Sequence, residues 1–67
     1  MSSGLPESGS IYAIVTLKTP QDVQGGVSPV FYVKTQQEQE HIAMWISRIT
    51  GAVVHDLHDG TWLLIPV

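Results

Sequence analysis

The sequence predicts a small α+β domain in which one amphipathic helix packs on an antiparallel sheet, with the element order β-β-α-β-β. Three observations support this class. Residues 35–50 combine a helix-start signal with apolar residues at helical spacing. Four short segments rich in strand-forming residues flank this stretch, two on each side. An Asp-Gly pair separates the last two segments, as is typical of a hairpin turn.

The first ten residues differ in composition from the rest of the chain. Residues 1–10 contain four serines, two glycines and a proline, which is typical of disorder. We therefore expect a disordered tail at 1–10 and a single α+β domain at 11–67. A chain of 67 residues buries about 60% of its unfolded surface, and this chain has no cysteine for a disulfide. Association with another chain is therefore the expected source of extra stability.

The two segments before the helix are predicted to be strands. Residues 11–18 alternate apolar with other side chains, which indicates a strand with one strongly apolar face. Residues 30–34 begin with Val-Phe-Tyr-Val and indicate a second strand that is apolar on both faces. The connection, residues 19–28, contains Pro20 and the pair Gly25-Gly26 and is predicted to be a loop.

The helix has signals at both ends. Thr35 and Glu38 have the spacing of a capping box, in which each side chain accepts a hydrogen bond from the other residue's N–H. Gly51 is placed to end the helix in the left-handed conformation. Trp45 and Trp62 are expected in the core, and a role as an interface anchor is the alternative. The stripe expected to face the sheet consists of Ile42, Trp45, Ile46 and Ile49.

The last two segments, residues 52–57 and 61–67, are predicted to form a hairpin. A two-residue turn at Asp59-Gly60 sets Leu57 opposite Trp62. The same register sets His55 opposite Leu64. One face then carries Leu57, Trp62, His55 and Leu64, and the other carries Val54, Leu63, Ile65 and Val67.

This pattern leaves more apolar sheet surface than one helix can cover. The face of the first two strands that points away from the helix is expected to carry Tyr12, Ile14, Val30 and Tyr32. We predict that these four residues form an interface and that a second copy of the sheet covers them in a homodimer. In the alternative, the loop 19–28 and the tail fold over this face.

A polar cluster at the end of the third strand suggests a metal site. Asp56 and His58 are expected to share a face beside the turn, and His41 is a third candidate ligand if the helix start lies near. Imidazole and carboxylate ligands favour Zn²⁺ or Ni²⁺. His55 points to the opposite face and is expected to be a core or interface residue, with a pH switch as its alternative. Ordinary hairpin polarity is the favoured interpretation of the cluster.

Motifs for catalysis and for cofactors are missing from the sequence. There is no cysteine, no Gly-x-Ser-x-Gly elbow and no phosphate-binding Gly-x-x-x-x-Gly-Lys loop. Ser47 lies within the helix with no base placed by spacing. We therefore expect neither enzymatic activity nor a cofactor.

Charge and hydropathy exclude two classes of partner. The cations are three, Lys18, Lys34 and Arg48, and the net charge is −3, so no basic stripe for nucleic acid is present. The longest apolar run, residues 62–65, is far shorter than the roughly 20 residues that cross a bilayer. The N-terminal residues do not resemble a secretory signal. We expect a cytoplasmic protein with no nucleic-acid or membrane partner.

These expectations favour a small non-enzymatic protein–protein interaction module. We predict a homodimeric regulator or an accessory subunit of a larger protein. The alternative hypothesis is a metal- or ligand-responsive binding module that uses His41, Asp56 and His58.

Overall fold

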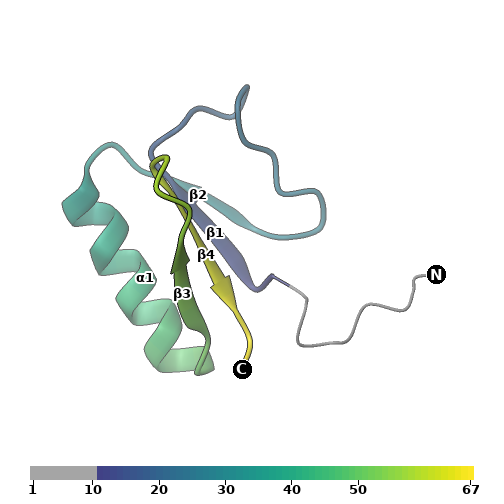
Figure 1. The fold of residues 1–67 in the computed structure, drawn as a ribbon, viewed down its shortest axis with the longest axis vertical. Coiled ribbons are helices and arrows are strands. Elements are labelled where there is room, and N and C mark those ends of the chain that lie inside the picture. The colour runs from purple at the N-terminus through teal and green to yellow at the C-terminus, as the bar shows by residue number, and fades with distance from the viewer. Residues whose placement is uncertain (1–10) are drawn as a thin grey trace.

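The structure, a computed structural model, describes residues 11–67. The tail predicted at residues 1–10 lies outside the described residues. The elements are β1 (Ala13–Thr16), β2 (Val30–Tyr32), α1 (Gln36–Thr50), β3 (Val53–Asp56) and β4 (Thr61–Ile65) (Figure 1). One helix packs on a four-stranded sheet, which confirms the α+β class and the predicted order of elements along the chain.

The sheet is mixed rather than wholly antiparallel. Its strand order is β2-β1-β4-β3, with antiparallel β1–β4 and β4–β3 pairs and a parallel β1–β2 pair. The sequence analysis expected an antiparallel sheet, and the parallel pair corrects that expectation. The physical reason lies in the connection. Residues 17–29 separate β1 from β2, and a segment of about a dozen residues is long enough for a parallel crossover.

Helix α1 connects the two edges of the sheet, because it follows β2 and precedes β3. It lies across one face of the sheet and packs on β1, β4 and β3 (Figure 1). It makes few contacts with β2. The connection between β1 and β2 lies on the other side of the sheet from the helix (Figure 1). One edge strand, β3, therefore contacts the helix, although all four of its residues are exposed, and the other edge strand, β2, hardly contacts it.

The predicted helix signals are confirmed except for one hydrogen bond. The N-cap residue Thr35 has extended backbone angles, and its hydroxyl accepts from the Glu38 N–H at 3.1 Å. The Glu38 carboxylate accepts from the N–H of Lys34 at 3.0 Å, one residue earlier than the capping box predicted. Gly51 ends the helix in the left-handed region at φ 76°, with its N–H donated to the Ser47 carbonyl.

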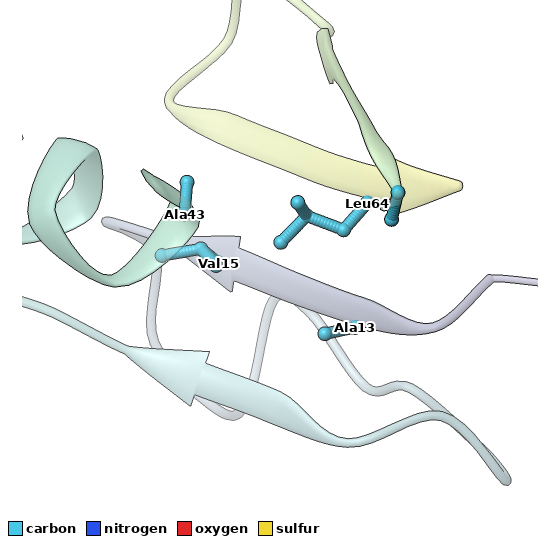
Figure 2. Packing of buried hydrophobic residues seen from close by; sticks show 5 residues of the cluster. Ala13, Val15, Ala43 and Leu64 are labelled. Carbon is cyan, nitrogen blue, oxygen red and sulfur yellow. The ribbon is translucent and has the colours of Figure 1, made fainter. Parts of the chain in front are cut away.

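The hydrophobic core lies between the helix and the centre of the sheet. The side chains of Val15, Ala43 and Leu64 point toward one another, with Ala13 beside them (Figure 2). Val15 and Leu64 are fully buried, and Ala43 is 1% exposed. A small residue at position 43 lets the helix approach the strands closely. Burial of side chains such as Val15 and Leu64 stabilises the fold by about 1.5–3 kcal/mol each.

The helix presents a different face to the sheet from the one predicted. Gln39 and Ala43 are its buried residues, and Ile42 and Ile46 are only half-buried. The predicted stripe was therefore wrong at its other two members. Trp45 is 47% exposed and Ile49 is 78% exposed. The prediction that Trp45 lies in the core was also wrong, while Trp62 packs against the core as a half-buried residue.

A buried glutamine accounts for this orientation of the helix. The Gln39 side chain is 1% exposed, and its Nε2 donates to the carbonyls of Val15 and Gly60, at 3.0 Å each. The amide thereby ties the first turns of the helix to β1 and to the β3–β4 turn. Because both donor hydrogens are used, the polar group is buried without the usual penalty on its N–H₂ group.

The β3–β4 hairpin is shifted by one residue from the predicted register. Val54 lies opposite Leu64, and His55 lies opposite Leu63. Residues 58–60 form the turn, because the Leu57 N–H donates to the Thr61 carbonyl at 3.0 Å. Val54 therefore shares the helix-side face with Leu64, whereas His55 lies on the other face with Leu63.

Aspartate side chains explain why the turn contains one residue more than predicted. The Asp56 carboxylate accepts from the His58 N–H at 2.7 Å, and the Asp59 carboxylate accepts from the Thr61 N–H at 3.1 Å. These local bonds favour a wider turn over the two-residue Asp-Gly type. His58 takes a positive φ of 63° and Gly60 one of 91°.

The face away from the helix is partly covered by the chain itself. Ile14 lies opposite Val30 in the parallel pair, as the predicted shared face required. The Tyr32 hydroxyl donates to the Val23 carbonyl at 2.7 Å, which brings the loop 19–28 over this face. Ile14 is only 7% exposed. The loop thus covers part of the surface, as the alternative interpretation expected for this segment.

Candidate interaction surface

Exposed apolar side chains lie on α1 and β2, and others, Val53, Val54 and Leu57, lie at the β3 edge. Phe31 lies opposite Val15, so its side chain is on the helix side of β2, where it remains 39% exposed. On the helix, Ile42, Trp45 and Ile49 share one flank because they are three and four residues apart. We call this surface the β2–α1 trough and define it as Phe31, Val33, Ile42, Trp45 and Ile49.

A pocket shows that this flank of the helix faces β2. Its volume is about 630 Å³, and both Val33, after β2, and Ile42, on α1, line it. Trp45 and Ile49 follow Ile42 along the same flank, toward the C-terminal end of the helix. The pocket forms one end of the trough, and helical spacing places Trp45 and Ile49 beyond it on the same flank. The complete lining is Tyr32, Val33, Lys34, Gln37, Glu38, His41 and Ile42.

Two neighbours on the helix restrict the position of the Trp45 ring. The His41 ring meets it edge-on, with centroids 6.5 Å apart and an interplanar angle of 75°. The Arg48 guanidinium lies over it, 5.8 Å from the ring centroid. A cation above an indole is attracted by the ring quadrupole, by about 0.5–1 kcal/mol at an exposed site. The indole is therefore held on the surface in one orientation although it is half exposed.

Positive charge borders the trough. Lys34 lines the pocket and Arg48 lies over Trp45, so two of the chain's three Lys and Arg residues are here. Glu38 also lines the pocket and supplies one negative charge, while its carboxylate accepts from the backbone N–H of Lys34. The chain as a whole has a net charge of −3, so this border differs in sign from the average surface.

The backbone of β2 has an open side. Ile14 donates to the Pro29 carbonyl at 2.9 Å, and Val33 donates to the Thr16 carbonyl at 2.9 Å. In a parallel pair, alternate residues bond to the neighbour, so the N–H and C=O groups of Val30 and Tyr32 point outward. Within residues 11–67, no other element forms a backbone hydrogen bond with these outward groups.

The four residues predicted as an interface have different environments. Tyr12 and Tyr32 are 46% and 42% exposed, and Val30 is half-buried. Ile14 is buried within the single chain and has little surface left for a partner. The register places Ile14 opposite Val30 on one face, but the loop 19–28 occupies part of the space above them.

The three candidate metal ligands are not all brought together. Asp56 and His58 are neighbours, with the His58 Nδ1 at 3.9 Å from the Asp56 Oδ2. His41 instead lines the pocket beside β2. Within the described residues, no three histidine, aspartate or glutamate side chains gather closely enough to hold a metal ion. His55, the candidate pH switch, is exposed on β3.

One further ion pair lies at the β3–β4 turn. Lys18, just after β1, donates from Nζ to the Asp59 carboxylate at 3.2 Å. This hydrogen bond lowers the pKa of Asp59 below its ordinary value of 3.8. The pair joins the β3–β4 turn to the start of the loop, at a distance from the trough.

Sequence reasoning missed the trough because it placed Trp45 and Ile49 in the core. One signal was present. His41, Trp45 and Arg48 have the i, i+4 and i+7 spacing that aligns an aromatic residue with a cation on one flank of a helix. The position of Phe31 on the helix side depends on the parallel pairing of β2, which the sequence did not reveal.

Comparison with known families identifies the family of this chain. A family model described as "Capping complex subunit for YIEGIA" matches residues 8–66. The chain belongs to this family. It is therefore a subunit of a complex, and it associates with other proteins, as the sequence analysis expected of an accessory subunit. No curated protein and no solved structure matches the chain. Among residues 11–67, no helix is both long and apolar enough to cross a membrane.

Proposed function

We propose that this chain is a non-enzymatic accessory subunit that binds YIEGIA, the component named in its family's description, through the β2–α1 trough. The family match supports the identity of the partner, because it covers residues 8–66. The trough supports the place of contact. Nothing in this proposal requires chemistry from the subunit itself.

The observation that carries the proposal is the exposure of large apolar side chains on one flank. Ile49 is 78% exposed and Trp45 is 47% exposed, in a chain whose helix has few other apolar residues at its surface. Exposed apolar side chains that gather in one patch mark interaction sites more often than scattered ones do. Tryptophan is also enriched among the residues that dominate binding energy, and Trp45 is already oriented by its neighbours.

The groups around the trough suit recognition rather than catalysis. Glu38 caps the helix, and Arg48 lies on an indole ring, so both side chains have structural roles. The pocket is open at one end of the trough and has room for a side chain of a partner. These features support the expectation that the subunit is not an enzyme.

The homodimer and the cytoplasmic location expected from the sequence stay predictions. Exposed Tyr12 and Tyr32 support self-association through the second face, whereas the loop that covers Ile14 reduces the area available for it. Light scattering over a dilution series tests the dimer. A mass that stays at one chain throughout would contradict self-association and leave the proposed binding of YIEGIA untouched.

Co-expression tests the proposed function. A tagged chain is co-expressed with YIEGIA, and the amount of YIEGIA that co-purifies is measured. Trp45→Ala should reduce that amount at least ten-fold, since removal of a central aromatic anchor costs about 2 kcal/mol or more. Met44→Ala is the matched control, because Met44 is 40% exposed on another side of the same helix. Failure of the unmodified chain to retain YIEGIA would contradict the proposal.

A further inference from the structure

We infer that β2 accepts an extended segment of YIEGIA as an added strand, and that this segment is apolar on one side and carries at least one carboxylate. The inference rests on the proposed function and specifies how the same surface would bind. It is argued from the backbone of β2, from the side chains above it and from the charges at the border.

The backbone supplies the hydrogen bonds. Val30 and Tyr32 direct their N–H and C=O groups away from β1, as the bonds of Pro29 and Val33 to β1 require. A segment that pairs with these groups lengthens the sheet by one strand, which is a common mode of peptide recognition. These main-chain hydrogen bonds contribute affinity and do not depend on which side chains the segment carries.

The trough supplies the selectivity. A strand added to β2 lies about 4.8 Å outward, and every second side chain points to the helix side. Those side chains would lie next to Phe31 and below Trp45 and Ile49, the uncovered apolar residues of this flank. The segment should therefore alternate, with apolar residues facing the helix. Its end would reach the pocket lined by Val33 and Ile42.

The charge at the border selects an acidic segment. Lys34 and Arg48 lie on the trough, and Glu38 supplies one opposing negative charge there. A carboxylate on the added strand would therefore meet net positive charge here, although the whole chain carries −3. Such complementarity increases the association rate and orients the partner.

A second copy of this chain is a poorer occupant of the same edge. Strand β2 has three residues, Val30–Tyr32, and the helix begins four residues later, at Gln36. A two-fold pair of such strands is limited to this short ladder, about 10 Å long. Stable interfaces bury about 800 Å² on each partner. An extended segment of another protein continues past β2 into the pocket and does not have this limit.

Two matched proline variants test the inference. Val30→Pro removes one outward N–H on β2, and Val54→Pro removes the corresponding outward N–H on β3, the opposite edge. We expect Val30→Pro to weaken binding of purified YIEGIA at least ten-fold, and Val54→Pro to change it less than two-fold. Equal losses for both variants, or no loss for Val30→Pro, would overturn the inference. Thermal melting of each variant shows whether it is folded.

Amide hydrogen exchange of the unmodified chain keeps the test independent of the proline variants. In the complex with YIEGIA, the amides of Val30 and Tyr32 should exchange more slowly than in the free chain. If YIEGIA binds and these amides stay unprotected, the inference fails and the proposed function stands. If YIEGIA does not bind, both fail. Protection in the concentrated chain alone would identify a second copy as the occupant and overturn the inference.

Discussion

The two edges of this sheet differ in their contact with the helix and in charge. Strand β3 contacts the helix, although its four residues are exposed, and the Ser47 hydroxyl of α1 donates to the Ala52 carbonyl just before it, at 2.7 Å. It ends in Asp56, and a charged residue is one of the ways in which proteins protect an edge from pairing. Strand β2 has the sequence Val-Phe-Tyr, without a charge, and the helix hardly covers it.

This difference follows from the size of the domain. A helix with its side chains is about 10 Å across. Four strands spaced about 4.8 Å apart span about 14 Å, so one helix leaves part of an edge bare. The bonds of Gln39 to Val15 and Gly60 place the helix over the β1, β4 and β3 side. The edge that the helix leaves bare is therefore β2, whereas β3 contacts the helix and ends in a charged residue.

The largest expected effect is a difference in stability between two substitutions, one in the centre of the sheet and one in β2. Leu64 is fully buried, whereas Phe31 is 39% exposed. Leu64→Ala should lower the free energy of unfolding by about 3 kcal/mol, because it leaves a cavity in the core. Phe31→Ala should lower it by about 1 kcal/mol, since little apolar area is lost. Urea denaturation measures both, and similar losses would show that β2 is covered as well as the centre.

The second prediction concerns the residue that sets the position of the helix. Gln39→Ala leaves the carbonyls of Val15 and Gly60 without this donor. The expected loss is about 1–3 kcal/mol in the free energy of unfolding, the typical penalty for a broken buried hydrogen bond. Gln37→Ala, two residues earlier and on the exposed side of the helix, is the control and should change stability little. Equal effects would mean that Gln39 does not anchor the helix.

The third prediction removes the protection of β3. Asp56→Val takes away the charge at that edge and the acceptor for the His58 N–H. We expect weak self-association at high protein concentration, because an uncharged apolar edge pairs more readily. Sedimentation velocity over a concentration series detects it, and Asp22→Val in the loop serves as the control. Unchanged sedimentation of Asp56→Val would argue that charge does not distinguish the two edges.

The smallest expected effect concerns the pH dependence of the pair at the β3–β4 turn. Lys18 lowers the pKa of Asp59. The pair therefore contributes its full stability at pH values above 3.8, the ordinary pKa of an aspartate. That contribution is lost as the pH falls through the lowered pKa. Lys18→Met should therefore differ from the unmodified chain near neutral pH and match it in strong acid. A difference that grows as the pH falls would contradict this sign.

Local signals in the sequence predicted more of the fold than of the surface. The cap at Thr35, the stop at Gly51 and the number of strands depend on neighbouring residues, and all are confirmed. The direction of β2 and the register of the hairpin depend on contacts between distant segments. The Asp56 and Asp59 side chains widened the turn by one residue, which moved Val54 to the helix side.

The proposed interaction surface was missed for the same reason. The apolar spacing of the helix correctly indicated one apolar flank, but it could not show that a glutamine would occupy the centre of the contact. With Gln39 bonded to the sheet, Trp45 and Ile49 are left exposed on the surface of the helix. Spacing thus identified an apolar group that includes Trp45, but it wrongly placed that residue against the sheet.

Amide hydrogen exchange at the two edges tests the central claim most directly. The outward amides of β2 are those of Val30 and Tyr32, and the outward amides of β3 include that of Val54. On binding of YIEGIA, we predict at least ten-fold slower exchange at Val30 and Tyr32 and unchanged exchange at Val54. Protection at Val54 with none at Val30 and Tyr32 would contradict the account and place the partner on the opposite edge.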